Sequence, residues 1–182
     1  MTPAEVSAYY EQNQLGFRDP ERRRLRQLVV SSEEQAKQAL AQLHGGAVEF
    51  EDLARRTSLG PTASDGGLVK GSVMRANDKA FVFASDAEAE AAGVTNLDPA
   101  LEAAAFAIDQ ANGLSSYVKA SDGRYHIFQL VERTAPRQRP LSEVSDDIKN
   151  FLIVQKLQQT INDLETKAAV ERFTDRLEGV AQ

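Results

Sequence analysis

The chain of 182 residues is 42% hydrophobic and 26% charged, which is typical of a globular protein long enough to bury a core. Its net charge of −6 argues against a general binder of nucleic acids or anionic membranes, and we interpret the local cluster of arginines between residues 18 and 26 as a solvated linker and strand edge. The chain contains no cysteine and no apolar run of about 18 residues, which excludes disulfides, thiolate metal sites, cysteine nucleophiles and a membrane-spanning helix within it.

A short amphipathic helix is predicted at the start of the chain. Thr2-Pro3-Ala4-Glu5 is a typical helix start, and Val6, Tyr9 and Tyr10 fall on one side of the helix that follows. Asp19-Pro20 then separates this helix from the next element. Because an isolated helix of this length is marginal in water, its apolar side predicts a packing partner.

A strand and two helices are predicted next. Leu25–Val30 has the pattern of a strand, and Ser31-Ser32 with Gln35 forms a capping box that starts a helix. This helix ends at Gly45-Gly46, and a shorter helix follows that stops at Gly60-Pro61. The apolar faces consist of Ala36, Ala39, Leu40 and Leu43 in the first helix, and of Phe50, Leu53 and Ala54 in the second.

The middle of the chain combines a short strand with a less regular segment. Leu68-Val69-Lys70-Gly71 is predicted to form a strand after a glycine-containing loop. The segment between Met74 and Leu97 contains Phe81-Val82-Phe83 and an alanine- and glutamate-rich helix from Asp86 to Ala92.

The stretch that follows predicts a helix and a β-hairpin. Asp98 is a good N-cap, Pro99 suits the first helical position, and the helix is expected to end at Asn112-Gly113. Tyr117-Val118-Lys119 and Tyr125–Val131 are β-rich runs separated by a turn that contains Asp-Gly. They predict two antiparallel strands, the second of them central in its sheet.

The longest regular element is predicted after a proline-bearing linker from Thr134 to Pro140. Apolar residues recur there at steps of three and four and mark one stripe along a helix of about 28 residues. A second stripe, from Val170 to Val180, is out of phase and predicts a bend or a separate short helix. The N-terminal helix is too short to cover the first stripe, so we expect a second copy, a missing segment or a client polypeptide to complete it. The first stripe consists of Leu141, Val144, Ile148, Phe151, Val154, Leu157, Ile161, Leu164 and Ala168.

In this order, the motifs resemble those of the parvulin-type peptidyl-prolyl isomerases, the PpiC or rotamase family, and especially its extracytoplasmic foldases such as SurA, PrsA and PpiD. The resemblance covers residues 20 to 134 approximately, from the first strand to the end of the hairpin. The matching residues at its centre are Pro99, Leu101, Glu102, Ala104, Phe106, Ile108, Gly113 and Tyr125-His126-Ile127.

The resemblance implies an α+β fold, with an antiparallel sheet core and surrounding helices over residues 20–135. Relative to the family, residues 75–97 approximately are an insertion, which is either a structural flap or a lid over the binding groove. The N-terminal helix, residues 1–19, and the C-terminal helical segment, residues 136–182, are then expected to form a helical lobe of the chaperone type.

Five site positions of the family can be carried over by motif. The resemblance implies two histidines on adjacent strands, an aspartate or cysteine that faces them, and a methionine and a phenylalanine that grip proline. The corresponding residues here are Gln27, His126, Gly60, Asn96 and Leu101. Only the second histidine is retained.

With these residues, the site meets neither of the two requirements for catalysis of prolyl isomerisation well. Rotation about an X-Pro bond meets a barrier of about 18–20 kcal/mol, so a catalyst needs an apolar cup for proline and polar groups that stabilise the twisted amide. Gln27 cannot change protonation state near neutral pH, and Gly60 has no side-chain acceptor. Asn96 and Leu101 make the cup more polar and shallower, at a loss of about 1–3 kcal/mol of proline binding. We therefore interpret the isomerase site as decayed.

Alternatives for the site remain open at this stage. His126 is either a catalytic candidate together with Gln27, or a core histidine that bonds Gln27 across adjacent strands. If Ser58, Ser64 or Asp65 supplies the missing polar group and Met74 the missing apolar one, the chain is an active isomerase. Phe106 and Met74 are the further substrate-binding candidates.

The resemblance implies a foldase or chaperone that binds unfolded or proline-containing polypeptides outside the cytoplasm, with weak or lost isomerase activity. It implies no cofactor and no nucleic-acid partner, and two histidines, His44 and His126, do not form a His-rich metal site. A homodimer through the C-terminal helix, and membrane association only through an upstream segment, are further expectations. The alternatives are an active prolyl isomerase and a non-enzymatic assembly module that dimerises through the long helix and binds one dedicated partner.

Overall fold

The computed structural model describes residues 1–167, which fall into two compact units. Asp19–Arg137 forms the first, here called the core unit. Met1–Arg18 and the chain from Gln138 onward form the second, here called the helical unit. Within the described residues, no helix combines the length and the apolar character needed to cross a membrane.

The core unit is built on a five-stranded sheet with the order β4-β3-β2-β6-β5. Two long antiparallel strands, β2 (Arg22–Val30) and β6 (Tyr125–Thr134), form its centre, with one irregularity in register between Arg24 and Leu25. Short strands complete it: β3 (Ser72–Val73), β4 (Val94–Thr95) and β5 (Val118–Lys119). The separate strands β1 (Arg18–Asp19) and β7 (Arg137–Gln138) pair with each other. The predicted α+β class, hairpin and central second strand are confirmed.

One pair of strands departs from the antiparallel pattern expected for the sheet. β3 and β4 run parallel, in the register Ser72 with Val94. Parallel neighbours need a long crossover connection, and the expected insertion supplies one through α4 (Ala76–Val82) and α5 (Asp86–Ala91). The strand predicted at Leu68–Gly71 is wrong in position, because Leu68 makes only an isolated bridge with Arg26 and the strand begins at Ser72.

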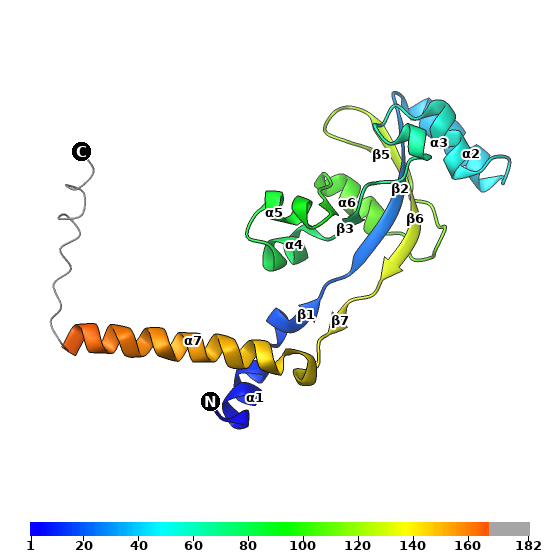
Figure 1. The fold of residues 1–182 in the computed structure, drawn as a ribbon. Coiled ribbons are helices and arrows are strands. Elements are labelled where there is room, and N and C mark those ends of the chain that lie inside the picture. The colour runs from blue at the N-terminus through cyan, green and yellow to red at the C-terminus, as the bar shows by residue number, and fades with distance from the viewer. Residues whose placement is uncertain (168–182) are drawn as a thin grey trace, which may run out of the picture. The chain divides into compact units, whose positions relative to one another are not determined.

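Helices lie on both sides of the central strand pair (Figure 1). This arrangement buries apolar side chains of β2 and β6 in two clusters, one on each face. Leu25 and Phe128 face α6 (Pro99–Phe106), and this side is called the α6 face. Leu28 and Ile127 face α2 (Glu33–His44) and α3 (Phe50–Thr57), and this side is called the α2–α3 face. A 3-10 turn, η2 (Ala63–Asp65), follows α3.

Helix starts follow the predicted caps, whereas the end of α6 does not follow its prediction. Ser32 Oγ accepts a hydrogen bond from the Gln35 backbone N–H, and an Asp98 carboxylate oxygen accepts one from Ala100. α6 ends at Phe106, well before Asn112-Gly113. Beyond it, Asn112 adopts a φ of 62° and its N–H donates to the Leu130 carbonyl, so this segment is tied to β6.

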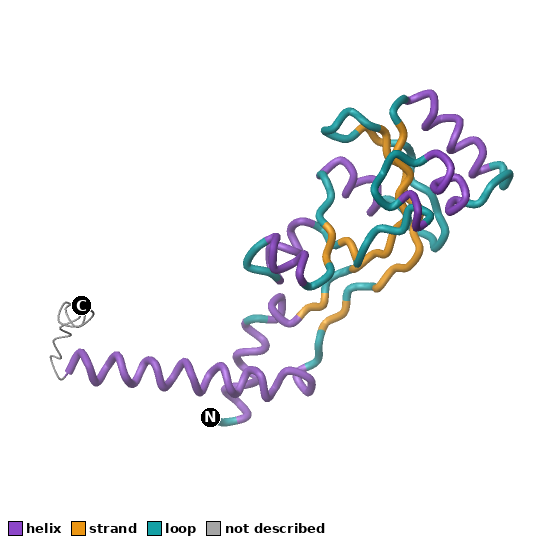
Figure 2. Tube along the Cα trace, turned by 45° about the horizontal axis from the view of Figure 1, so that its top comes forward, coloured by secondary structure: helices purple, strands orange, loops and turns teal. Residues whose placement is uncertain are grey.

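The helical unit pairs α1 (Pro3–Gln12) with the first turns of α7 (Leu141–Lys167), which Figure 2 shows as one unbroken helix. Thr2 and Glu5 form a capping box at the start of α1. Val6 packs against buried Val144 and Ile148 of α7. A 3-10 turn, η1 (Gln14–Phe17), follows α1. The predicted second stripe lies outside the described residues. Ala168, the last residue of the first stripe, also lies outside the described residues. Five stripe residues beyond Ile148 are solvent-exposed: Phe151, Val154, Leu157, Ile161 and Leu164.

Candidate functional site

Gln27 and His126 lie side by side on the α6 face of the central strand pair. In the register of β2 and β6, Gln27 is opposite Phe128 and Val29 is opposite His126, so the two side chains are diagonal neighbours. The Gln27 amide nitrogen lies 2.6 Å from His126 Nδ1. With this nitrogen as donor, Nδ1 accepts, and the neutral imidazole carries its proton on Nε2.

The other ring nitrogen of His126 faces Asp122, in the turn of the hairpin. Nε2 is buried without a hydrogen-bond partner, and the nearest carboxylate oxygen, Asp122 Oδ1, is 3.7 Å away. Burial lowers the pKa of His126, and the nearby charge of Arg124 adds to this, while Asp122 and Asp98 act in the opposite direction. The net shift of the pKa is downward, which favours the neutral ring. Hydrogen bonds, first from Ser121 and then from Ala100, lower the pKa of Asp98.

Gly60 lies against Val29, and the space for a side chain at this position is taken. A Cβ built on Gly60 would approach Val29 Cγ2 to 2.9 Å, and Val29 is the residue opposite His126. Ser58 Oγ accepts hydrogen bonds from the N–H groups of Val29 and Gly60, at 3.1 and 3.2 Å. The hydroxyl of Ser58 therefore stabilises the loop backbone, and an acidic or thiol side chain at Gly60 would displace Val29.

Leu101 and Phe106 of α6 are part of the packed core. Leu101 is 6% exposed and belongs to the same apolar cluster as Leu25 and Phe128. The Phe106 ring lies between two guanidinium groups, with Arg23 Cζ 4.6 Å and Arg75 Cζ 4.3 Å from its centroid.

Met74 and Asn96 belong to the inserted crossover. Met74 is 3% exposed and clusters with Ala89 and Val94, apart from the cluster that holds Leu101. Asn96 Oδ1 accepts a hydrogen bond from Lys79 Nζ of α4. The structure thus brings Gln27 and His126 together, whereas Gly60 contacts Val29. Leu101 and Met74 lie in two separate packed clusters, and Asn96 is exposed.

The family model for the PPIC-type PPIase domain matches residues 1–146. This chain is a parvulin. It is 27% identical over 171 residues to the putative peptidyl-prolyl cis-trans isomerase YacD of Bacillus subtilis, a match that covers 93% of this chain and 51% of YacD. Its sequence therefore spans about half the length of that relative.

Two solved structures share the fold of this parvulin. One comes from the work on PEB4 and the periplasmic protein Cj1289 of Campylobacter jejuni, described as two SurA-like chaperones. It has a TM-score of 0.73 at 25% identity, and the match covers 94% of this chain and 64% of that one. The other is PrsA of Bacillus cereus, with a TM-score of 0.51 at 21% identity over 95% of this chain and 57% of that one.

The acidic surroundings of His126 in this parvulin were not predicted from the sequence. The sequence indicates Asp98 only as a helix cap and Asp122 only as a turn residue. The spacing of four residues from Asp122 to His126 across a tight turn was the one local signal. Within residues 1–167, no three acidic or histidine side chains are grouped to hold a metal ion.

The stability of this parvulin should depend on pH through His126. Because burial holds the folded-state pKa of His126 below its ordinary value of 6.5, the unfolded chain binds the proton more readily. The contribution of neutral His126 is complete above the ordinary pKa and is lost as the pH falls through the folded-state pKa. In urea denaturation, the stability advantage of the wild type over His126→Asn should therefore shrink between about pH 8 and about pH 5. An advantage that does not change with pH would contradict this assignment.

Proposed function

We propose that this parvulin is a foldase that binds unfolded extracytoplasmic polypeptides and retains weak or no prolyl isomerase activity. The observation that carries the proposal is the 2.6 Å contact between the Gln27 amide and His126 Nδ1. A ring nitrogen that accepts this bond is not available to a substrate, and Gln27 offers no second titrating group.

The surroundings of the pair support the same proposal. Catalysis of amide rotation requires polar groups that stabilise the twisted amide better than the planar one, next to a pocket for the proline ring. Val29 fills the space at Gly60, and Leu101 and Met74 are engaged in separate packed clusters. An isomerase of this form would have to rearrange its core to admit a proline.

The binding part of the proposal is supported by the exposed stripe of α7. Phe151, Val154, Leu157 and Leu164 are each at least half exposed on one helix, which is unusual for a surface without a partner. The likeness to a structure from the work on SurA-like chaperones agrees with polypeptide binding, and the printed description of Cj1289 as periplasmic agrees with an extracytoplasmic location. A homodimer through this stripe is the competing arrangement.

A peptide isomerisation assay tests the catalytic part. Uncatalysed X-Pro isomerisation takes on the order of 10–100 s, so even weak catalysis is measurable. We expect the wild type to add little to this rate and His126→Ala to leave the rate unchanged, since the ring bonds a neighbour and not the substrate. Gln27→His should not restore activity, because Val29 still fills the space at Gly60.

Circular dichroism on each variant serves as the folding control. Strong acceleration by the wild type that disappears in a folded His126→Ala protein would overturn the proposal. It would instead establish an active isomerase.

A further inference from the structure

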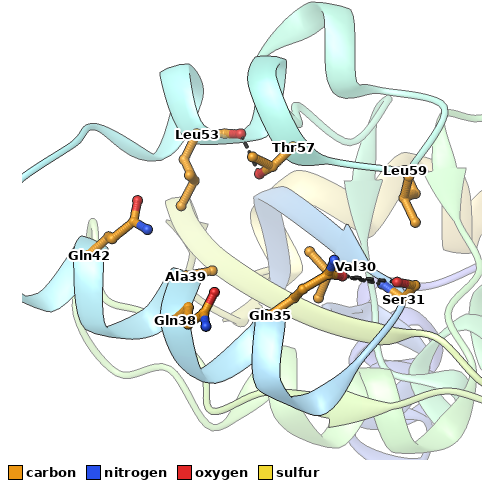
Figure 3. Close-up of a pocket in the computed structure, with 9 residues that line it drawn as sticks. All are labelled: Val30, Ser31, Gln35, Gln38, Ala39, Gln42, Leu53, Thr57 and Leu59. Atoms are coloured by element: carbon orange, nitrogen blue, oxygen red, sulfur yellow. Dashed lines mark hydrogen bonds between the residues drawn. The ribbon is translucent and has the colours of Figure 1, made fainter.

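The α2–α3 face of the core unit carries a pocket of about 320 Å³ (Figure 3). Gln27 and His126 lie on the other face of the sheet, because their side chains alternate with those of Leu28 and Ile127. The floor of the pocket is apolar. Val30 of β2, Ala39 of α2 and Leu53 of α3 line it and are 4%, 5% and 6% exposed. A pocket of this size accommodates one or two side chains, so it suits a short segment of a ligand.

Three glutamines of α2 form one wall of the pocket. Gln35, Gln38 and Gln42 are three and four residues apart, which places them on one side of the helix, and all three line the pocket. Figure 3 shows the amides of Gln38 and Gln42 and the side chain of Leu53 directed toward the space between the two helices.

These amides retain capacity for hydrogen bonds. Gln35 uses its oxygen, which accepts from the N–H and Oγ of Ser31 at 3.1 and 2.9 Å, and its NH₂ group has no recorded acceptor within residues 1–167. Gln38 uses its NH₂ group, which donates to Glu34 at 3.5 Å, so its oxygen can accept. The side-chain amide of Gln42 makes no hydrogen bond to any other described residue. The wall therefore offers both donors and acceptors, the combination that a peptide backbone also presents.

The pocket contains no charged side chain among its described lining residues, although both helices carry charges elsewhere, such as Glu33, Lys37 and Arg55. An uncharged lining disfavours charged ligands, because a charge taken from water into the pocket would find no partner. At the rim, Leu59 is 54% exposed and extends the apolar surface beyond the pocket.

We propose that this pocket binds an extended, uncharged polypeptide segment, with one aliphatic side chain on the floor and its backbone amides paired with the glutamines. It would be a second polypeptide site, separated by the sheet from the site of Gln27 and His126. The inference rests on the proposed function only in taking a polypeptide as the ligand.

The test uses the full chain, labelled with ¹⁵N, and the blocked peptide acetyl-Gly-Asn-Leu-Asn-Gly-amide. Titration should shift backbone NMR signals in α2, in α3 and at Leu59. Replacement of the central leucine of the peptide by aspartate should abolish these shifts. The double variant Gln38→Glu with Gln42→Glu should weaken binding by about 10-fold, because it removes the donors and places charge on the wall. Leu59→Ser should weaken peptide binding, because it removes apolar surface at the rim of the pocket.

Ala41→Glu is the matched control, because Ala41 is exposed on the same helix but does not line the pocket. It should bind the peptide like the wild type. Affinity unchanged in the double glutamate variant, or signal shifts confined to the strands around Gln27 and His126, would overturn the proposal. The second result would leave the proposed function intact, whereas strong isomerase activity would overturn that function and leave this pocket unaffected.

Discussion

Replacing Arg23 with leucine is expected to lower the free energy of unfolding by about 3–5 kcal/mol. Arg23 is 2% exposed, which is rare for an arginine and requires that its donors be paired. Its Nη1 donates to the carbonyl oxygens of Ala105 and Ile108, at 2.8 and 2.7 Å. Its Nε donates to Glu21 at 2.7 Å. Leucine would leave two buried carbonyls and one partly buried carboxylate without this partner.

Arg24→Leu is the matched control on the same strand. Arg24 has a side chain that is 52% exposed and lies 3.6 Å from Glu132, so its loss should cost less than about 1 kcal/mol. Arg23→Lys should fall between the two, because one ammonium group cannot reproduce the planar set of donors. Chemical denaturation followed by circular dichroism measures all three. Equal losses in the free energy of unfolding from Arg23→Leu and Arg24→Leu would show that the buried contacts of Arg23 do not stabilise the fold more than an exposed arginine does.

The effect of Arg23 should also depend on pH through Glu21. Burial alone would raise the pKa of Glu21, but hydrogen bonds and charge from Arg23 and Arg133 outweigh it, and the net pKa lies below the ordinary value of 4.5. A lowered pKa in the folded state means that the pair stabilises the fold above the ordinary pKa. This stabilisation is lost as the pH falls through the lowered value. The difference in the free energy of unfolding between the wild type and Arg23→Leu should therefore become smaller at acidic pH.

Ile148→Asp and Val154→Asp, which lie on the same stripe of α7, should have opposite consequences. Ile148 is 2% exposed and packs with Val6 and Val144, so a carboxylate there would be buried without a partner. We expect a loss of about 4 kcal/mol or more from the helical unit, seen as a lower melting temperature. Val154 is 65% exposed, and its replacement should change stability by less than about 0.5 kcal/mol.

Ile148→Asp and Val154→Asp also distinguish a role of the stripe in stability from a role in binding. If the exposed stripe holds unfolded chains, Val154→Asp should reduce suppression of aggregation of an unfolded reference protein while melting like the wild type. Gln155→Asp, on the neighbouring exposed position, controls for the added charge. Sedimentation velocity reports whether the stripe joins two copies instead. If Val154→Asp still suppresses aggregation fully and has the same solution mass as the wild type, the stripe is not part of the binding surface.

Elements with local signals can be predicted from the amino-acid sequence alone. The capping residues Thr2, Ser32 and Asp98 start their helices where predicted, because a cap bonds backbone groups within three residues. The hairpin follows from its Asp-Gly turn, with Gly123 at a φ of 82°. The apolar period also predicts the continuous helix described over Leu141–Lys167. The bond between Gln27 and His126 was also among the expected arrangements, since strand pairing alone makes them neighbours.

Features that depend on contacts between residues distant in the sequence could not be predicted in this way. α6 ends early where Arg23, 82 residues from Ala105, binds the carbonyls that a longer helix would have used itself. The parallel pair of β3 and β4 depends on how the inserted crossover returns to the sheet. Val29 occupies the space at Gly60, and the charge of Asp98 acts on His126, between residues that are distant in the sequence. Side-chain volume and charge are properties of single residues, but which of them meet is determined by the packing of the whole chain.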